Sequence, residues 1–208
     1  MKIIKAGYEI LDSLDGAEIL RRIERCGRVC YKSEDRISGG SAEDFVRGII
    51  RRGHESVLEH ASFTVKFIVD RGVSHELVRH RIASFSQEST RYCNYASEKF
   101  GTELVVVEPF FLTPDTAAWN WWALACRQAE NAYFGMLDFG CSPQEARSVL
   151  PNSLKTEVVM TANLREWRHF LRLRTAPAAH PQMREVAVPL LAELRDRIPV
   201  VFDDAGET

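Results

Sequence analysis

Apolar and polar residues alternate over several short stretches of the chain, and this pattern predicts strands. The clearest case is residues 62–70, where every second residue is apolar, namely Phe63, Val65, Phe67 and Val69, with Ile68 as the exception. Strict alternation is typical of a half-buried strand. We also expect a strand or extended lead-in over residues 2–10 and apolar strands over residues 104–107 and 154–161.

Other segments repeat their apolar residues every three or four positions, which is typical of helices that bury one face. Together with capping residues, this pattern predicts helices over residues 15–31, 41–52, 74–81, 113–139, 142–151, 163–174 and 181–197. We expect N-caps at Ser41, Ser74 and Asn163, and prolines in the first helical position after Thr113 and Ser142. No linker, repeat or low-complexity tract divides the chain, so residues 1–208 are predicted to form a single mixed α/β (α+β) domain.

Composition excludes several classes of protein. The 208 residues (23.7 kDa) are 45% hydrophobic and 27% charged, which is ordinary for a globular protein and argues against disorder. The net charge of −2 argues against a generally basic nucleic-acid binder. No window has the roughly 18 apolar residues of a membrane span, and the N-terminus shows no signal-peptide pattern, so we expect a cytoplasmic protein with no membrane partner. The five cysteines are then expected to be free thiols, and no pattern predicts a metal site.

Common motifs for nucleotide binding and hydrolysis are missing. There is no Gly-x-Gly-x-x-Gly, Walker A or Gly-x-Ser-x-Gly motif, and His54-Glu55 and His75-Glu76 lack the second histidine of a zincin. No cysteine follows a proline, as the nucleophile does in thymidylate synthases that use a cysteine. Pyrimidine chemistry on this chain would therefore proceed without that thiolate.

The most informative segment covers residues 79–92, which combine three arginines, a histidine and many hydroxyl and amide groups. A solvated polar loop is one interpretation. The interleaved apolar residues Ile82, Ala83 and Phe85 favour another, an anchored cationic loop for a phosphorylated ligand.

The expected helix after Asn163 carries a second cluster. Helical spacing places one polar stripe on a single face, consisting of Arg165, Arg168, His169 and Arg172. This stripe is either a solvated face or a ligand contact, and Asn163 is either a plain N-cap or a ligand contact. Arg174 falls on the apolar side, where a cation needs a charged or hydrogen-bonding partner.

The order and spacing of these motifs resemble the flavin-dependent thymidylate synthases. The resemblance rests on Arg79-His80-Arg81 followed after seven residues by Ser89, on the stretch from His54 to His60, and on residues 89–92, 146–151, 161–165 and 170–174. It spans about residues 50–185. It implies a curved, largely antiparallel sheet flanked by helices, a homotetramer with shared active sites, and the ligands FAD, NADPH, 5,10-methylenetetrahydrofolate and dUMP.

The resemblance also implies roles for individual residues. Cofactor contacts would fall on Ser56, Arg79, His80, Arg81, Gln87, Asn163, Leu164, Arg165 and His169. Contacts with dUMP would fall on Glu76, Leu77, Val78, Arg79, Gln87, Glu88, Ser89, Thr90, Arg91, Arg147 and Arg174. The catalytic residue would be Arg174, which matches the family residue that polarises the uracil ring. The sequence departs from other members at Glu76, at His169 and in the order of Gln87 and Glu88. The resemblance therefore constrains the contacts of these residues less than those of the others.

Residue types agree with this chemistry. Without a thiolate, a fixed positive group near the uracil carbonyls must stabilise the developing enolate, and arginine keeps its charge and offers two parallel donors. Ser89 lacks a nearby His–acid pair in sequence, so we assign it to binding. Two other hypotheses stay open here: a non-catalytic nucleotide- or RNA-binding module, and a flavoprotein oxidoreductase that does not methylate.

Overall fold

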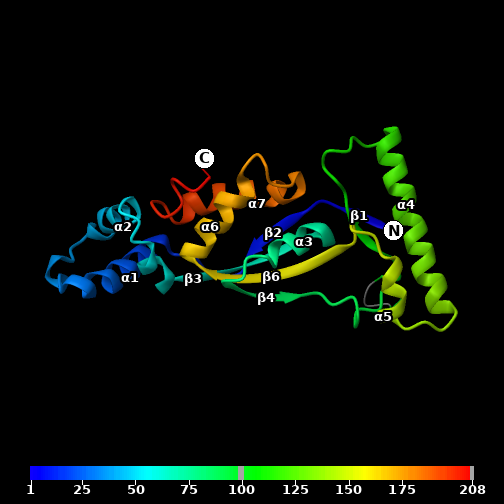
Figure 1. The fold of residues 1–208 in the computed structure, drawn as a ribbon, viewed down its shortest axis with the longest axis horizontal. Helices are drawn as coiled ribbons and strands as arrows, with labels where there is room; N and C mark the ends of the chain where they lie inside the picture. Colours follow the sequence, from blue (N-terminus) through cyan, green and yellow to red (C-terminus); the bar gives the residue numbers. More distant parts are fainter. Residues whose placement is uncertain (98–100, 207–208) are drawn as a thin grey trace. The chain divides into compact units, whose positions relative to one another are not determined.

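A computed structural model describes residues 1–97 and 101–206. The strands are β1 (Lys2–Ile4), β2 (Gly7–Ile10), β3 (Ser62–Asp70), β4 (Ala83–Gln87), β5 (Val105–Val107) and β6 (Lys155–Asn163) (Figure 1). The helices are α1 (Gly16–Arg28), α2 (Ser41–Arg51), α3 (Arg71–Leu77), α4 (Ala117–Asp138), α5 (Pro143–Ala146), α6 (Leu164–Thr175) and α7 (Pro181–Arg197). Short 3-10 turns include η1 (Val29–Tyr31), η2 (Glu34–Arg36), η3 (Glu55–His60) and η5 (Arg147–Val149).

Two sheets organise the strands. Four strands form an open antiparallel sheet in the order β2-β3-β6-β4, and β1 pairs in parallel with β5, with Ile3 opposite Val106. The predicted mixed α/β fold with helices flanking an antiparallel sheet is therefore confirmed. On β3 the alternation has the expected cause, because Phe63, Val65, Phe67 and Val69 are all buried.

The chain forms two compact units that interleave in sequence. We call Met1–Gly7, Phe67–Arg79 and Ser86–Val159 the first unit, and Tyr8–Lys66, His80–Phe85 and Met160–Thr208 the second unit. The prediction of a single domain over residues 1–208 remains a prediction. In the described part of the chain, no helix is both long enough and apolar enough to cross a membrane.

In the first unit, the long helix α4 packs against the short helix α5, as Figure 1 shows. Tyr133 of α4 lies in a core cluster with Tyr95, Leu104 and Leu154. The N-terminal ammonium group of Met1 forms ion pairs with Glu103 and Glu130 at 3.2 and 3.0 Å. The β1–β5 pair is thus tied at its start to the segment that leads into and along α4.

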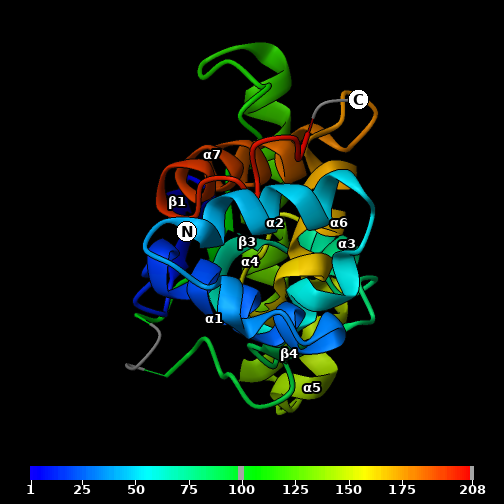
Figure 2. The same cartoon turned by 90° about the vertical axis from the view of Figure 1, so that its left-hand side faces the viewer.

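In the second unit, helices pack in the pairs α1–α2 and α6–α7 (Figures 1 and 2). The 3-10 segment η3 contacts both α1 and α6. Trp167 of α6 stacks on Phe63 with ring centroids 4.8 Å apart and donates from Nε1 to the Phe63 carbonyl oxygen. Gly16 allows α1 to start close to the end of α7, because a Cβ there would lie 2.2 Å from the Arg197 carbonyl oxygen.

Several capping predictions are confirmed. Asn163 caps α6 by accepting from the Glu166 backbone N–H at 2.9 Å, and Ser142 and Glu145 form the capping box of α5. Strand β6 and helix α7 also match their predicted ranges within two residues.

Other boundaries were predicted wrongly. Helix α3 is capped by Asp70 rather than Ser74, whose hydroxyl instead donates to the Arg71 carbonyl oxygen. Helix α4 begins at Ala117 with Thr116 as N-cap, not after Thr113. Gly40 at positive φ, rather than Ser41, occupies the N-cap of α2. Residues 83–87, expected to be part of a loop, form the strand β4.

Candidate active site

A pocket of about 470 Å³ in the second unit is built mainly from one face of α6. It is lined by Glu55, Glu59, Ile82, Asn163, Arg165, Glu166, His169 and Arg172. The α6 residues recur every three or four positions, so they project from one side of the helix. The stripe predicted on this helix therefore lines a cavity, and three of its four members, Arg165, His169 and Arg172, lie at the pocket.

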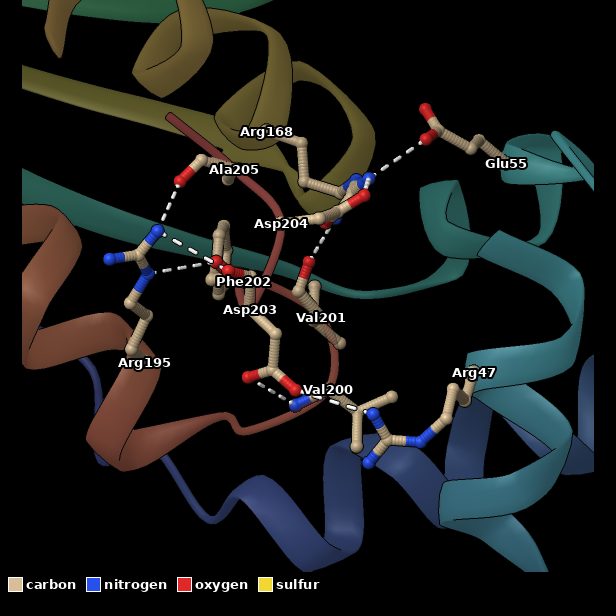
Figure 3. A network of polar contacts seen from close by, with 10 residues as sticks. All are labelled: Arg47, Glu55, Arg168, Arg195, Val200, Val201, Phe202, Asp203, Asp204 and Ala205. Carbon is tan, nitrogen blue, oxygen red and sulfur yellow. Dashed lines mark hydrogen bonds and ion pairs between the residues drawn. The ribbon is translucent and has the colours of Figure 1, made fainter. Parts of the chain in front are cut away.

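The fourth member of the stripe, Arg168, behaves differently. The sequence left a solvated face open, but the Arg168 side chain is only 1% exposed. Its Nη2 donates to Glu55 at 3.1 Å, and both terminal nitrogens bind the carboxylate of Asp204 (Figure 3). Arg168 also donates to the Val201 carbonyl oxygen. A buried arginine needs such partners because an uncompensated charge is very costly to desolvate.

The contacts of Arg168 with Val201 and Asp204 hold the segment that follows α7 in place. Arg195 of α7 donates to the backbone carbonyl oxygens of Phe202, Asp203 and Ala205 at 3.2, 3.3 and 2.8 Å (Figure 3). The segment after α7 is therefore held by two arginines from two helices.

Both glutamates from η3 at the pocket form ion pairs with arginines of α6. Glu55 pairs with Arg168, and Glu59 pairs with Arg165 at 2.7 Å. The exposed Glu59–Arg165 pair holds less stabilisation than the buried one, because solvent screens it. Pairing nonetheless lowers the negative charge that η3 presents to a ligand, while His169 and Arg172 add donors.

Arg174, the predicted catalytic residue, is half-buried at the end of α6. Its Nε donates to Nε2 of His80 at 3.0 Å, and Nδ1 of His80 lies 3.1 Å from Oε1 of Glu166. His80 and Glu166 are only 5% and 6% exposed. The partner that the sequence required for Arg174 is thus a buried histidine from 94 residues earlier in the chain.

Burial and neighbouring charges shift the pKa values of His80 and Glu166. Burial, together with the charge of Arg174 and of His169, lowers the pKa of His80 from 6.5 to about 4. Burial also raises the pKa of the Glu166 carboxyl. His80 is therefore neutral near pH 7, and its contact with Glu166 is a hydrogen bond rather than an ion pair.

His80, Glu166 and His169 place possible ligand atoms within 4.8 Å of one another. We do not assign a cation to them, because both ring nitrogens of His80 are already engaged and the guanidinium of Arg174 is adjacent. For the same reason, a hydrogen bond from the His80 ring to a cofactor would have to displace one of these partners.

The first unit has a polar pocket of about 370 Å³ of its own, lined by Arg71, His75, Thr90, Arg147, Ser148, Leu150, Pro151, Asn152 and Leu154. Arg147 donates from Nη1 to the Thr90 hydroxyl at 3.4 Å. Two arginines and two hydroxyls suit a phosphate group, for which arginine offers bidentate donors.

Gln87 is the last residue of β4 and Glu88 follows it, and both side chains bind partners within the first unit. Gln87 donates from Nε2 to Ser74 Oγ at 3.0 Å and to Thr156 Oγ1 at 3.3 Å. Glu88 accepts from Lys155 at 3.0 Å and from the Tyr95 hydroxyl at 3.3 Å. Lys155 offsets part of the charge of Glu88, since it also pairs with Glu157 at 2.7 Å.

The remaining predicted residues are distributed as follows. Arg79, Arg81 and Arg91 are exposed, as is Val78, whereas Glu76 and Ser89 are half-buried. Leu77 and Leu164 are fully buried, so a ligand could reach only their backbone. Ser56 lines another pocket of the second unit, with residues that include Cys30, Tyr31 and His54.

Sequence reasoning missed several pocket residues. Arg71 and His75 lie four residues apart on α3, and this helical spacing was a usable signal. Ser148 stands next to Arg147, and Ile82 lies inside the arginine-rich segment. Glu55 and Glu59 belong to the quoted His54–His60 motif but were not assigned a role.

Comparison with known proteins identifies relatives. The family described as "Thymidylate synthase complementing protein" matches residues 9–200. The flavin-dependent thymidylate synthase of Geobacter sulfurreducens is 36% identical over 186 residues, covering 86% of this chain and 78% of that protein. The enzyme of the same name from Pyrococcus furiosus is 36% identical over 172 residues, covering 82% and 70%.

A solved structure resembles this one over nearly its full length. It is the UMP/dUMP methylase PolB from Streptomyces cacaoi bound with 5-Br dUMP, with a TM-score of 0.79, 26% identity, and coverage of 98% of this chain and 96% of that one. With a family match across most of the sequence and relatives above 30% identity, the chain belongs to the flavin-dependent thymidylate synthase family.

Proposed function

We propose that the chain catalyses the reductive methylation of dUMP: dUMP, methylenetetrahydrofolate, NADPH and a proton give dTMP, tetrahydrofolate and NADP⁺. Family membership supports thymidylate synthesis and dependence on a flavin. In this reaction the C5–H bond of uracil is replaced by C5–CH₃. The carbon comes from folate, and two electrons come from NADPH through FAD.

The residues at the second-unit pocket fit a flavin. Asn163, Arg165, His169 and Arg172 can all donate hydrogen bonds to ring carbonyls or phosphates, and Ile82 adds an exposed apolar surface for a ring. Bound there, a flavin would supply hydride transfer, which protein side chains cannot perform. Arg79 and Arg81, which precede Ile82 in the sequence, are both exposed and would add two cations for the flavin phosphates.

We assign dUMP binding to the arginine-rich segment and the first-unit pocket. Arg147 and Thr90 would hold the phosphate, with Ser89 and Arg91 beside Thr90 in sequence. Gln87, held by Ser74 and Thr156, would offer its amide to the base or to the cofactor. Glu76, Leu77, Val78 and Glu88 remain proposed contacts, with Leu77 acting through its backbone.

Arg174 would polarise the uracil. A guanidinium beside the imide stabilises negative charge that develops on the carbonyl oxygens when C5 becomes nucleophilic. Its half-buried position strengthens this field relative to water. Once C5 has formed its bond to the one-carbon unit donated by folate, loss of the C5 proton to water restores the C5=C6 double bond of uracil, and no cysteine adduct is required.

Further parts of the proposal rest on the family alone: a homotetramer with shared active sites, NADPH as the reductant, methylenetetrahydrofolate as the carbon donor, and a cytoplasmic location. One observation carries the proposed function. Arg174 lies on α6, the helix that lines the donor-rich pocket, and it donates a hydrogen bond to the buried side chain of His80.

An absorbance spectrum of the purified protein, with and without dUMP and NADPH, tests the proposal. We expect flavin absorption that bleaches with NADPH, and dTMP formation once folate is added. Protein that is colourless after reconstitution with FAD, yet binds dUMP or RNA, would show a binding module instead. Bleaching without dTMP would show an oxidoreductase that does not methylate.

The cofactor assignment has a separate test. Arg81→Ala should weaken FAD retention about ten- to a hundredfold, because a charge-assisted hydrogen bond contributes roughly 1.5–3 kcal/mol. Arg22→Ala, on an exposed position of α1, is the control. Equal FAD affinity in the two variants would remove Arg81 from the flavin site.

A further inference from the structure

Glu166, His80 and Arg174 form a continuous chain of side chains within the second unit. Nδ1 of His80 lies 3.1 Å from the Glu166 carboxylate, and its Nε2 lies 3.0 Å from Nε of Arg174. Phe170 packs edge-on against the His80 ring, with centroids 4.9 Å apart. The ring is thus held at both nitrogens and on its surface.

The chemistry of the partners defines the state of the histidine. Arginine has only donors, so the Nε2 atom that faces Arg174 must carry a lone pair. The ring proton is then on Nδ1, where the Glu166 carboxylate accepts it. A doubly protonated ring could not accept from Arg174, and the lowered pKa of His80 agrees with a neutral ring.

This arrangement fixes the orientation of the Arg174 guanidinium. The contact with His80 uses Nε, on the side edge of the group. A shift of the His80 ring would therefore turn the whole planar guanidinium. Arginine recognises planar groups through parallel donors, so such a rotation disturbs its donors together.

We infer that His80 and Glu166 are positioning residues for Arg174: Glu166 accepts the Nδ1 proton and so anchors the His80 ring, and His80 orients the guanidinium toward the uracil imide. This inference rests on the proposed function for the role of Arg174. It assigns His80, which the motif resemblance places at the flavin, to alignment of the residue that acts on the nucleotide.

Two variants of His80 separate its two contacts. Glutamine carries its amide at the ε position, where His80 accepts from Arg174, whereas asparagine carries its amide at the δ position, where His80 faces Glu166. We expect His80→Asn to lower kcat for dTMP about a hundredfold, in line with a misplaced catalytic group. His80→Gln should keep kcat within several-fold of the parent. Both should retain FAD and fold, as judged by flavin absorbance and thermal unfolding.

The tautomer can be observed in the parent protein without any turnover. In protein labelled with ¹⁵N-histidine, two-dimensional nitrogen spectra should show one neutral ring with its proton on Nδ1, and this signal should disappear in His80→Gln. Glu166→Gln replaces the charged acceptor of the Nδ1 proton with a weaker neutral one, so it should lower the affinity for dUMP in titration calorimetry while the nitrogen spectrum keeps the proton on Nδ1.

The inference is overturned if His80 carries its proton on Nε2, or if the His80→Asn and His80→Gln variants have equal kcat. These outcomes differ from failure of the proposed function, in which the parent itself would form no dTMP while the nitrogen spectrum still reported the tautomer.

Discussion

Arg168 on α6 grips the carboxylate of Asp204 with two hydrogen bonds, from Nη1 at 2.6 Å and from Nη2 at 3.0 Å. The arginine is fully buried, while the Asp204 side chain is half exposed. Hydrogen bonding by Arg168 lowers the pKa of Asp204. The stabilising contact is therefore complete above the ordinary carboxyl pKa and is lost as the pH falls through the lowered value.

Arg168→Ala should lower the free energy of unfolding by about 1.5–3 kcal/mol, the range for hydrogen bonds to charged groups, because the Asp204 carboxylate left behind is half exposed to water. Arg21→Ala is the matched control, since Arg21 pairs with Glu18 on the exposed face of α1 and should contribute less than about 1 kcal/mol. Urea unfolding measures both. An Arg168→Ala loss no larger than that of Arg21→Ala would contradict a structural role for the network.

His80 should make stability depend on pH in a defined window. Its pKa is lowered to about 4 by burial and by the charges of Arg174 and His169, so between pH 6.5 and 4 the unfolded chain binds a proton that the folded chain does not. The free energy of unfolding should therefore fall as the pH is lowered through this window. The raised pKa of Glu166 acts in the opposite direction, so the comparison must be between variants.

Between pH 7 and pH 5, the free energy of unfolding should fall by about 2 kcal/mol more in the parent than in His80→Gln, because glutamine cannot titrate at this position. His60→Gln, at an exposed histidine of η3, serves as the control. Parallel pH profiles for the parent and His80→Gln would show that His80 is not held neutral in the folded protein.

Arg147 should contribute to affinity through the nucleotide phosphate. Arg147→Ala removes a charged donor from the first-unit pocket and should weaken dUMP binding about ten- to a hundredfold, while binding of deoxyuridine stays unchanged. Arg127→Ala, at an exposed position of α4, is the control. Titration calorimetry with dUMP and with deoxyuridine measures both affinities. An equal loss of affinity for deoxyuridine would place Arg147 away from the phosphate.

The strength of the local sequence pattern decided which elements could be predicted. Strand β3 and helices α6 and α7 were predicted almost to the residue, because their periodicity is strong and their caps are unambiguous. Strand β4 was missed because Ala83–Gln87 is short and mostly polar, so its ladder partner, not its own pattern, makes it a strand. Ser74 was mistaken for a cap because the stronger cap, Asp70, also ends a strand.

For the site, residue types could be predicted but not their partners. Sequence indicated that Arg174 needs a partner, yet His80 is distant in the chain and joins it only through the fold. The burial of Arg168 was equally hidden, since it depends on Glu55 and on Asp204 near the C-terminal end. Helical spacing alone placed Arg165, His169 and Arg172 together, because these residues share one face of α6.

No thiol should be essential. The five cysteines all lie in the described part of the chain and form no disulfide there, and burial raises the pKa of the Cys126 thiol, which disfavours the nucleophilic thiolate. A protein with all five changed to Ala or Ser should still form dTMP if it folds. Cys93→Ala is the most stringent single variant, because Cys93 lies just beyond the arginine-rich segment. A folded, flavin-loaded Cys93→Ala protein without turnover would refute this prediction.

Release of tritium from dUMP labelled at C5 tests the central claim most directly, because it reports the loss of the C5 proton that Arg174 is proposed to promote. We predict that Arg174→Lys and Arg174→Ala bind FAD and oxidise NADPH normally but release tritium about 10²–10³ times more slowly than the parent at saturating dUMP, while Arg22→Ala matches the parent. Tritium release by Arg174→Ala near the parent rate would contradict the account.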